Sequence, residues 1–297
     1  MNEWYIRIVI LNYNEPQFTA DLVNQLGKQT YTNTEIVVVD NASEPQHREM
    51  LHRLLPPHVY TIYSPLNIGY SRGNNLGLRL PSSREIDYHL VLNNDIVIED
   101  PDFIRKMAEG LNHNAPAGAV AGSPLVNTVA SAVLQEQQIQ VRRVLSKNQM
   151  FKLATPVFTP FIRKLTDHFV YRSELPYRGK YMICDSVNGA AFIIEDKFLR
   201  DIDFLDEGTF LYYEELILGR QIKDLGKTCF LNGYTEIKHL QGVSTKSRGR
   251  QINVQMERYK YESTLYYLKK YEGIGIFAQK LFILLNEFSI VLKKLLR

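Results

Sequence analysis

The sequence has 297 residues, of which 45% are hydrophobic and 23% are charged, and its formal net charge is +3. These values are typical of a globular protein with one large domain, and the Lys and Arg residues cluster late in the chain, so no nucleic-acid partner is expected. The two cysteines, Cys184 and Cys229, have neither metal-ligand spacing nor the pattern of a secreted disulfide framework, which favours a reducing, cytoplasmic location.

Short apolar runs alternate with helical segments in the first half of the chain. The runs of strand length are residues 6–11, 35–40, 59–63 and 88–93. Helices are expected from Pro16 to about Lys28, after Ser43, and up to about Arg79. This alternation is typical of a parallel α/β sheet. The first strand follows directly after Glu3, so we expect no signal peptide.

The second half of the chain is less regular. The predicted elements are a helix over 101–110, a strand at 117–125, a strand at 186–194, a helix over 214–226, a strand from about 229 towards 239, and helices from 251. Residues 127–180 have no clear period, which is typical of functional loops or local helices.

Residues 274–297 are predicted to form an amphipathic helix with a wide apolar face. That face comprises Leu281, Leu284, Leu285, Phe288, Val291, Leu292, Leu295 and Leu296. Lys280 and Glu287 interrupt the apolar sequence, so we expect no transmembrane helix. The pattern leaves two interpretations open. The helix either packs on its own domain or a partner, or lies in the plane of a membrane surface with its basic residues.

Four polar clusters lie where a parallel sheet would bring them to one edge. They are residues 12–14, Asp40, residues 72–75 and residues 93–95. Each alone has an ordinary explanation, because Asn and Asp are favoured in turns. Ligands of open α/β sheets, however, bind at the carboxyl ends of the strands, so the four clusters together predict a ligand site. The first turn lacks a glycine-rich dinucleotide motif, which disfavours a nicotinamide cofactor.

The order and spacing of these motifs resemble a known family. The motifs are Val9-Ile10-Leu11-Asn12-Tyr13-Asn14, Ile36 to Ser43, Asn67-Ile68-Gly69-Tyr70 with Gly73 to Gly77, and Leu92-Asn93-Asn94-Asp95. They closely resemble family 2 glycosyltransferases of the GT-A fold, and most of all the bacterial rhamnosyltransferase-like members that build cell-surface polysaccharides. Residues 187–190, 210–215 and His239 extend the resemblance over about residues 5–245.

The resemblance implies a Rossmann-like α/β fold with a mostly parallel central sheet flanked by helices. The GT-A domain would span residues 1–250, with a nucleotide-binding half at about 1–125 and an acceptor half at about 126–250. Residues 251–297 would form a C-terminal helical extension. The implied partners are a UDP- or dTDP-sugar donor, with rhamnose among the sugars considered, and a glycan or lipid-linked sugar acceptor.

The resemblance also assigns nucleotide-sugar-binding positions. Asp40 is similar to the carboxylate that holds the base or ribose, and Asn12 and Asn14 would line the same pocket. Arg72 or Asn74 would lie near the nucleotide. Asn93 and Asn94 belong to the segment that faces the sugar diphosphate.

A divalent cation is implied at the end of the same segment. Asp95 matches the last Asp of the family's metal motif, whereas the usual first Asp is Asn93 here. One carboxylate, water and substrate phosphates suffice for Mg²⁺ or Mn²⁺. His239 matches a family histidine near the diphosphate and is a further candidate ligand, although a lone histidine is more often structural.

The candidate catalytic residues are Glu214 and Glu215. Acidic residues at the start of a helix also suit the helix dipole, but the family carries an acidic pair here whose second member is the base. That member is Glu215, with Glu in place of Asp, and Glu214 or Asp206 are the alternatives. The base would deprotonate the acceptor hydroxyl in a single displacement with inversion. Basic residues at 246–250 could close over the diphosphate or touch anionic lipid.

The resemblance favours a peripheral protein at the cytoplasmic, inner face of the plasma membrane, where an anionic membrane surface is a partner. A homodimer is also left open. Two other functions remain as alternatives, namely a sugar nucleotidyltransferase and a non-catalytic subunit with the same fold. The first would be expected to show a glycine-rich basic loop after the first strand, which residues 12–16 are not.

Overall fold

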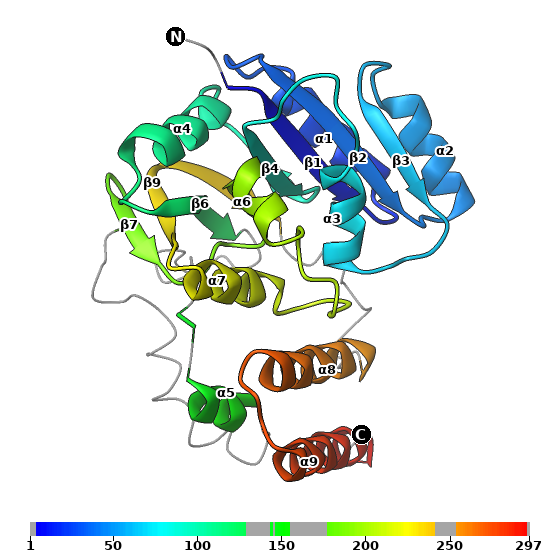
Figure 1. The fold of residues 1–297 in the computed structure, drawn as a ribbon. Helices are drawn as coiled ribbons and strands as arrows, with labels where there is room; N and C mark the ends of the chain where they lie inside the picture. The colour runs from blue at the N-terminus through cyan, green and yellow to red at the C-terminus, as the bar shows by residue number, and fades with distance from the viewer. Residues whose placement is uncertain (1–3, 129–142, 145, 155–176, 241–253, 296–297) are drawn as a thin grey trace.

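The computed structural model describes residues 4–128, 143–144, 146–154, 177–240 and 254–295 (Figure 1). The strands are β1 (Ile6–Asn12), β2 (Thr34–Asn41), β3 (Tyr60–Ser64), β4 (Tyr88–Asn93), β5 (Ile96–Val97), β6 (Ala119–Thr128), β7 (Tyr181–Cys184), β8 (Ala191–Glu195) and β9 (Thr228–His239). The helices are α1 (Pro16–Leu26), α2 (Pro45–Leu54), α3 (Tyr70–Leu78), α4 (Phe103–Glu109), the π-helix η1 (Gly110–Asn114), α5 (Lys147–Ala154), α6 (Asp196–Asp201), α7 (Glu214–Asp224), α8 (Val254–Lys270) and α9 (Ile276–Leu295).

The strands form one mixed sheet in the order β3-β2-β1-β4-β8-β6-β9-β5, and β7 pairs with β9. Pairing is parallel from β3 to β4 and between β6 and β9. Pairing is antiparallel where β8 joins β4 and β6, and where β5 and β7 join β9. The expected α/β class with a central sheet flanked by helices is confirmed, and the parallel part holds the first four strand ends at one edge.

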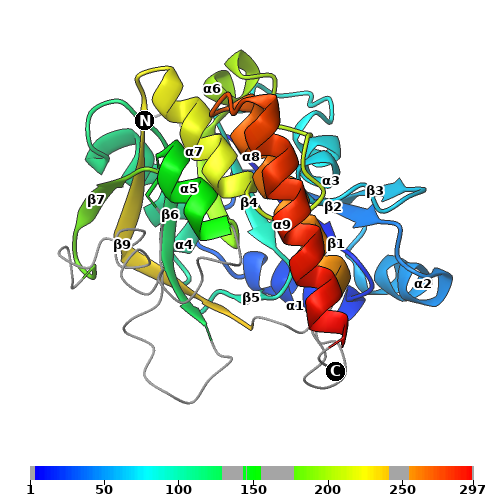
Figure 2. The ribbon, with the colours of Figure 1, turned by 90° about the horizontal axis from the view of Figure 1, so that it is seen from below.

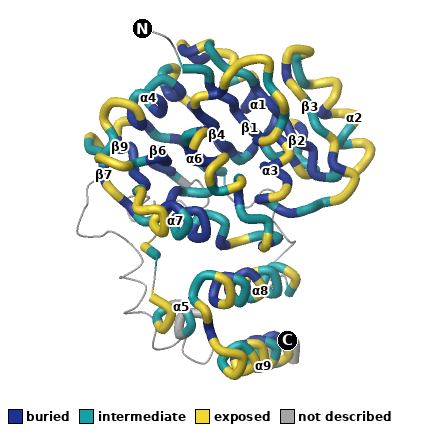
Figure 3. Tube along the Cα trace, viewed as in Figure 1, coloured by how far each residue is buried: buried dark blue, intermediate teal, exposed yellow. Residues whose placement is uncertain are grey.

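Helices cover both faces of the sheet because strand side chains alternate between them. Ile6, Ile8 and Ile10 of β1 pack in one core with residues of α1, α2 and α4. Val9 points the other way, into a second core with residues of α3, α6 and α7. Figure 3 shows these strands as the most buried part of the chain.

Two glycines place α3 close against the sheet. A Cβ atom at Gly73 would lie 2.6 Å from Cδ1 of Leu11, and one at Gly77 would lie 2.7 Å from Cγ1 of Val9. Any larger residue would push the helix away from β1. The N-terminus of α3 is thereby held beside the ends of β1 and β2.

Three elements differ from the expectation at the sequence level. β7 and α6 were not predicted. β7 has only four residues and α6 only six, which is too few to show a repeating pattern of apolar residues. The strand expected over 186–194 is β8, which begins at Ala191 after an isolated bridge to Asn188. α5 is a local helix inside the stretch that had no clear period.

A third apolar core joins the C-terminal helices to the sheet domain. Tyr213, Leu216 and Ile217 near the start of α7 pack against α8 and α9, where Tyr267 and Phe282 are fully buried. α8 lies between the sheet domain and α9, and Figure 2 shows α9 in front when the molecule is seen from below. In the described part of the chain, no helix has the length and apolar character needed to span a bilayer.

Candidate functional site

Side chains from three strand ends form one hydrogen-bonded network. Nδ2 of Asn12 donates to Oδ1 of Asp40 at 2.8 Å, and Oδ1 of Asn12 accepts from Oγ1 of Thr19 at 2.8 Å. Nδ2 of Asn94 donates to Oγ1 of Thr19 at 3.1 Å. β1 lies between β2 and β4 in parallel register, so these strand ends meet at one edge. The structure brings together Asn12, Asp40 and Asn94, as the sequence predicted.

Asn14 joins this network from the turn after β1. Its backbone has a φ of 59°, in the left-handed region that asparagine tolerates better than most residues. The N–H of Asn14 donates to Oγ of Ser43 at 2.8 Å, and Oδ1 of Asn14 accepts from the N–H of Glu44 at 2.7 Å. The hydroxyl of Ser43 in turn donates to Asp40. The turns after β1 and β2 are therefore fastened to each other.

Asp40 lies beneath the surface of this edge. Its side chain is fully buried, and its Oδ2 accepts from Nε of Arg48 at 3.1 Å. The Arg48 guanidinium is half-buried and stacks 5.3 Å from the ring centroid of Tyr63, which is exposed. Direct contact between Asp40 and a nucleotide therefore requires Arg48 to move. Arg48 was not among the residues expected at this site.

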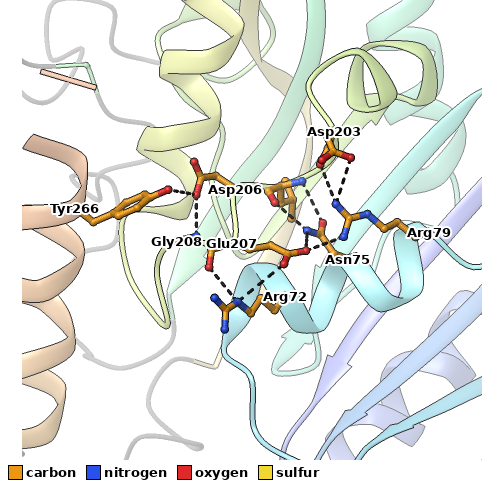
Figure 4. Close-up of polar contacts among 9 residues, drawn as sticks. Arg72, Asn75, Arg79, Asp203, Asp206, Glu207, Gly208 and Tyr266 are labelled. Carbon is orange, nitrogen blue, oxygen red and sulfur yellow. Dashed lines mark hydrogen bonds and ion pairs between the residues drawn. The ribbon is translucent and has the colours of Figure 1, made fainter. Parts of the chain in front are cut away.

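Arg72 and Asn74 do not join the network around Asn12. Asn74 is fully buried and donates from Nδ2 to the carbonyl of Tyr70 at 3.1 Å. Arg72 points to the loop before α7, where its Nε donates to the carbonyl of Glu207 at 3.1 Å (Figure 4). In that position Arg72 helps to hold the loop rather than to face the ends of β1 and β2.

Asp95 and His239 meet at the end of the central strands. Oδ1 of Asp95 lies 3.1 Å from Nε2 of His239, and both side chains are largely buried. The pairing of β5 with β9 produces this contact, since Ile96 is opposite His239 and the N–H of Leu240 donates to the carbonyl of Asp95 at 2.9 Å. Two residues that are far apart in the sequence are thus held at one point.

The donor set at this point suits a hard divalent cation. A carboxylate and an imidazole are ordinary ligands of such ions, and Mg²⁺ in particular is often held by one or two carboxylates with water and phosphates. Asn93 adds a half-buried amide two residues before Asp95. Within the described ranges, no group of three or more His, Cys, Asp or Glu side chains is placed to hold a metal. The protein therefore offers a partial site that substrate oxygens would have to complete.

Glu214 and Glu215 begin α7 after an unusual stretch of backbone. Tyr212 and Tyr213 have φ values of 74° and 76°, and consecutive non-glycine residues in this region are a sign of a strained functional turn. The Oε1 atom of Glu214 is buried and has no hydrogen-bond partner in the described structure. Burial, followed by the nearby charge of Glu215, raises the pKa of Glu214 to about 8.

Glu215 faces the loop that precedes β8. A Cβ atom at Gly189 would lie 3.9 Å from Oε2 of Glu215, and the carbonyl of Gly189 accepts from the hydroxyl of Tyr70 at 2.8 Å. The next carbonyl, that of Ala190, accepts from the N–H of Asn93 at 2.9 Å. A short stretch of backbone therefore links the segment that carries Asp95 to the carboxylate of Glu215.

Tyr70 belongs to the same group although the sequence did not single it out. Burial raises the pKa of Tyr70 well above its ordinary value, and the charges of Glu214 and Glu215 raise it further. Its backbone N–H donates to the carbonyl of Phe210 at 2.9 Å. Tyr70 therefore stays protonated and joins α3 to the loops that carry the two glutamates.

Asp206, the third candidate base, is occupied by the C-terminal helices. It accepts a hydrogen bond from the hydroxyl of Tyr266 at 2.8 Å (Figure 4). It also accepts one from the hydroxyl of Tyr271, and it pairs with Lys270 at 2.6 Å. Burial opposes ionisation, but these hydrogen bonds and one from the N–H of Gly208 prevail and lower the pKa of Asp206. A carboxylate held in this way is a poor proton acceptor. The basic residues 246–250 lie outside the described residues.

The chain matches known sugar-transfer proteins in sequence. Glycosyl transferase family 2 matches residues 7–168. The low-salt glycan biosynthesis hexosyltransferase Agl10 of Haloferax volcanii is 27% identical over 214 residues, which cover 71% of this chain. The matched region spans 59% of the length of that relative.

Two solved structures share the fold. The structure of GalNAc-T7 with UDP, GalNAc and Mn²⁺ has a TM-score of 0.64 at 14% identity, covering 90% of this chain and 48% of that one. The mannosyltransferase PcManGT of Pyrobaculum calidifontis, in complex with GDP-Man and Mn²⁺, has a TM-score of 0.56 at 12% identity, covering 99% of this chain and 74% of that one. At these identities the likeness concerns the fold.

Proposed function

This chain belongs to glycosyl transferase family 2, and we propose that it moves a sugar from a nucleotide-sugar donor to a hydroxyl of an acceptor with inversion at the anomeric carbon. The expected GT-A fold with a C-terminal helical region is confirmed. Sugar transfer is the activity of the family and of the hexosyltransferase relative. The donor, the acceptor and the roles of single residues are our proposals.

One observation carries the assignment of roles. The N–H of Asn93, two residues before Asp95 of the Asp95–His239 pair, donates to the carbonyl of Ala190, and the adjacent Gly189 lies beside the carboxylate of Glu215. A diphosphate held by Asp95 and His239 and an acceptor hydroxyl held by Glu215 would both lie next to the donor sugar. An inverting displacement needs this arrangement, with leaving group and base on opposite sides of the reacting carbon.

Glu215 is the proposed base. An alcohol near neutral pH is a weak nucleophile until a positioned base takes its proton. Burial raises the pKa of Glu214 to about 8, which favours its protonated form near neutral pH and disfavours it as a proton acceptor. Asp206 is held by α8 and its neighbours. Of the three carboxylates, Glu215 is left to accept the proton of the acceptor hydroxyl at its carboxylate oxygen.

Asp95 and His239, with the amide of Asn93 nearby, are the residues that would hold Mg²⁺ or Mn²⁺. A bound divalent ion supplies positive charge next to the departing nucleoside diphosphate. The two structural neighbours contain Mn²⁺ together with UDP or GDP-Man, which supports the proposal. The protein contributes one carboxylate here, so the donor's phosphate oxygens would complete the coordination.

The nucleoside end of the donor is proposed to lie over the turns after β1 and β2. Tyr13 and Tyr63 expose their rings at this edge, and Arg48 stacks on Tyr63. Asp40 would act mainly by holding Arg48 and the two turns in place. We propose a UDP- or dTDP-sugar as donor, and a glycan or lipid-linked sugar of cell-surface polysaccharide synthesis as acceptor.

A donor panel tests this function. The protein is incubated with UDP-, dTDP- and GDP-sugars with and without Mn²⁺, and free nucleoside diphosphate is measured. We expect release from one class of donor, dependent on Mn²⁺ and absent from Glu215→Gln. Pyrophosphate formed from a nucleoside triphosphate and a sugar phosphate would indicate a nucleotidyltransferase instead. No reaction with any donor in the presence of a membrane extract would favour a non-catalytic subunit.

A further inference from the structure

α9 exposes an apolar face that the described part of the chain leaves uncovered. This outer face consists of Phe277, Leu281, Leu284, Phe288 and Val291, which recur every three or four residues along the helix. Phe277 is 80% exposed, Leu284 is 66% exposed and Phe288 is 62% exposed. A row of large apolar side chains on one helix face is rare on soluble surfaces and marks an interaction site.

The opposite face of α9 already serves the fold. Phe282 and Ile290 are buried, and the ring of Phe282 lies 5.7 Å from that of Phe151 in α5. Arg258 and Tyr261 of α8 donate to the carboxylate of Glu287. α9 is therefore anchored to the described fold by its inner side. Figures 2 and 3 show α9 as the outermost helix, with exposed residues along it.

The charge of this segment indicates what covers the outer face. Residues 274–297 contain four basic residues and one acidic residue, Glu287; the basic residues are Lys280, Lys293, Lys294 and Arg297. A second copy of the chain would bring the same positive excess and be repelled. An anionic lipid surface offers both an apolar interior and the opposite charge. Ile276 and Ile283 are also exposed, so the apolar surface is broader than the narrow seam of a helix pair.

We propose that the outer face of α9 lies in the interface of an anionic lipid bilayer. Phe277, Leu281, Leu284, Phe288 and Val291 enter the acyl boundary, and Lys280 contacts the headgroups. The long axis of α9 then lies in the plane of the membrane, and α8 is the next layer above it.

Docking of α9 also orients the loop that leads to the two glutamates. α8 is tied to this loop at three points: Tyr266 donates to Asp206 at 2.8 Å, Ser263 donates to the carbonyl of Leu211 at 2.8 Å, and Tyr259 stacks on Phe210 with 4.4 Å between centroids. These contacts connect the helix pair directly to the loop before α7. If the proposed function holds, the docked helix determines the direction from which a lipid-linked acceptor reaches Glu215.

Vesicle flotation tests the docking. The full chain is mixed with vesicles of phosphatidylglycerol and phosphatidylcholine, or of phosphatidylcholine alone, and floated on a density gradient. We expect the protein to float with the anionic vesicles, to be released by high salt, and to remain at the bottom with phosphatidylcholine. The double variant Leu284→Glu and Phe288→Glu should lower binding by more than about a hundredfold, since two large apolar side chains no longer leave water.

The matched control also replaces two exposed apolar residues by Glu, but away from α9, namely Ile183→Glu and Leu225→Glu. It should float like the wild type. Equal flotation of the Leu284/Phe288 variant and the wild type would overturn the proposal. The proposal would also be overturned if the wild type did not bind vesicles and eluted as a dimer, and if the Leu284/Phe288 variant eluted as a monomer. The test does not depend on turnover, because Glu215→Gln should float normally even if the proposed function is wrong.

Discussion

Oδ1 of Asp95 lies 3.1 Å from Nε2 of His239, across 144 positions of sequence. The contact depends on the short strand β5, which turns back after Asn94 to pair with the end of β9. A turn residue at the end of one strand and a histidine at the end of another thereby become neighbours. This pair is the part of the structure that best suits a divalent cation, and it determines where the diphosphate of a donor would lie.

Asp95→Ala should weaken the response of the enzyme to Mn²⁺. Loss of the only carboxylate of the pair removes the charge that attracts the ion, so we expect the half-activating Mn²⁺ concentration to rise by more than about tenfold and turnover to fall sharply. Activity is measured as nucleoside diphosphate release over a Mn²⁺ titration. Asp21→Ala, at an exposed position of α1, is the control. An unchanged titration curve in a folded Asp95→Ala protein would refute the metal assignment.

Glu215→Gln should bind donor normally and lose turnover. Gln keeps the shape of the side chain but cannot accept the acceptor proton, so kcat should fall by about 10² to 10⁴, whereas KM for the donor should change by no more than about twofold. Steady-state kinetics at saturating acceptor provide both values. Glu214→Gln is the matched variant and should retain most activity, because Glu214 is already neutral. The reverse result would assign the base to Glu214.

Glu214→Gln should also change how stability depends on pH. Burial raises the pKa of Glu214 from 4.5 to about 8, so between these values the folded chain binds a proton that the unfolded chain has released. The unfolding free energy contributed by this group is therefore present below about pH 4.5 and is lost as pH rises towards 8. Gln removes this loss.

We expect the Glu214→Gln protein to match the wild type near pH 4.5 and to exceed it by roughly 4 kcal/mol at pH 8. Urea unfolding at a series of pH values measures the difference. Glu49→Gln, at an exposed position of α2, should give a curve parallel to that of the wild type. If the Glu214→Gln curve is parallel as well, Glu214 is ionised in the folded protein.

Gly69→Ala should destabilise the junction between α3 and the loop before α7. Gly69 has a φ of 86°, and a Cβ atom there would lie 2.3 Å from the carbonyl oxygen of Phe210. We expect a loss of roughly 3 kcal/mol or more in the free energy of unfolding. Gly226→Ala shares the left-handed backbone, with φ 67°, but has no atom within 4 Å and should cost only about 1 kcal/mol. Equal losses would show that backbone strain alone accounts for the effect.

The network of Asn12, Asp40 and Asn94 could be predicted because carboxyl ends of neighbouring parallel strands must meet at one edge. Arg72 could not be placed by the same argument, because its direction depends on how α3 is rotated. Gly73 and Gly77 turn one face of α3 onto β1, so Arg72 points to the loop at Glu207 instead. Packing, not strand position, decides the direction of a helical side chain.

The two adjacent glutamates show a second limit of the sequence. Nothing in the order of Glu214 and Glu215 indicates which is buried. The left-handed backbone of Tyr212 and Tyr213 precedes α7, at whose start Oε1 of Glu214 is buried and Oε2 of Glu215 lies beside Gly189. The short elements β7 and α6 could not be predicted from the sequence either, because their pairing and packing partners are distant in sequence.

The decisive measurement is a crystal structure of the protein with Mn²⁺ and the nucleoside diphosphate of its donor. We expect an anomalous peak for Mn²⁺ within coordination distance of Asp95 and His239, a diphosphate completing its coordination, and Glu215 across the donor site from it. A Mn²⁺ peak bound elsewhere, or a diphosphate that lies away from Asp95 while the nucleotide is fully ordered, would refute the proposed metal and diphosphate site.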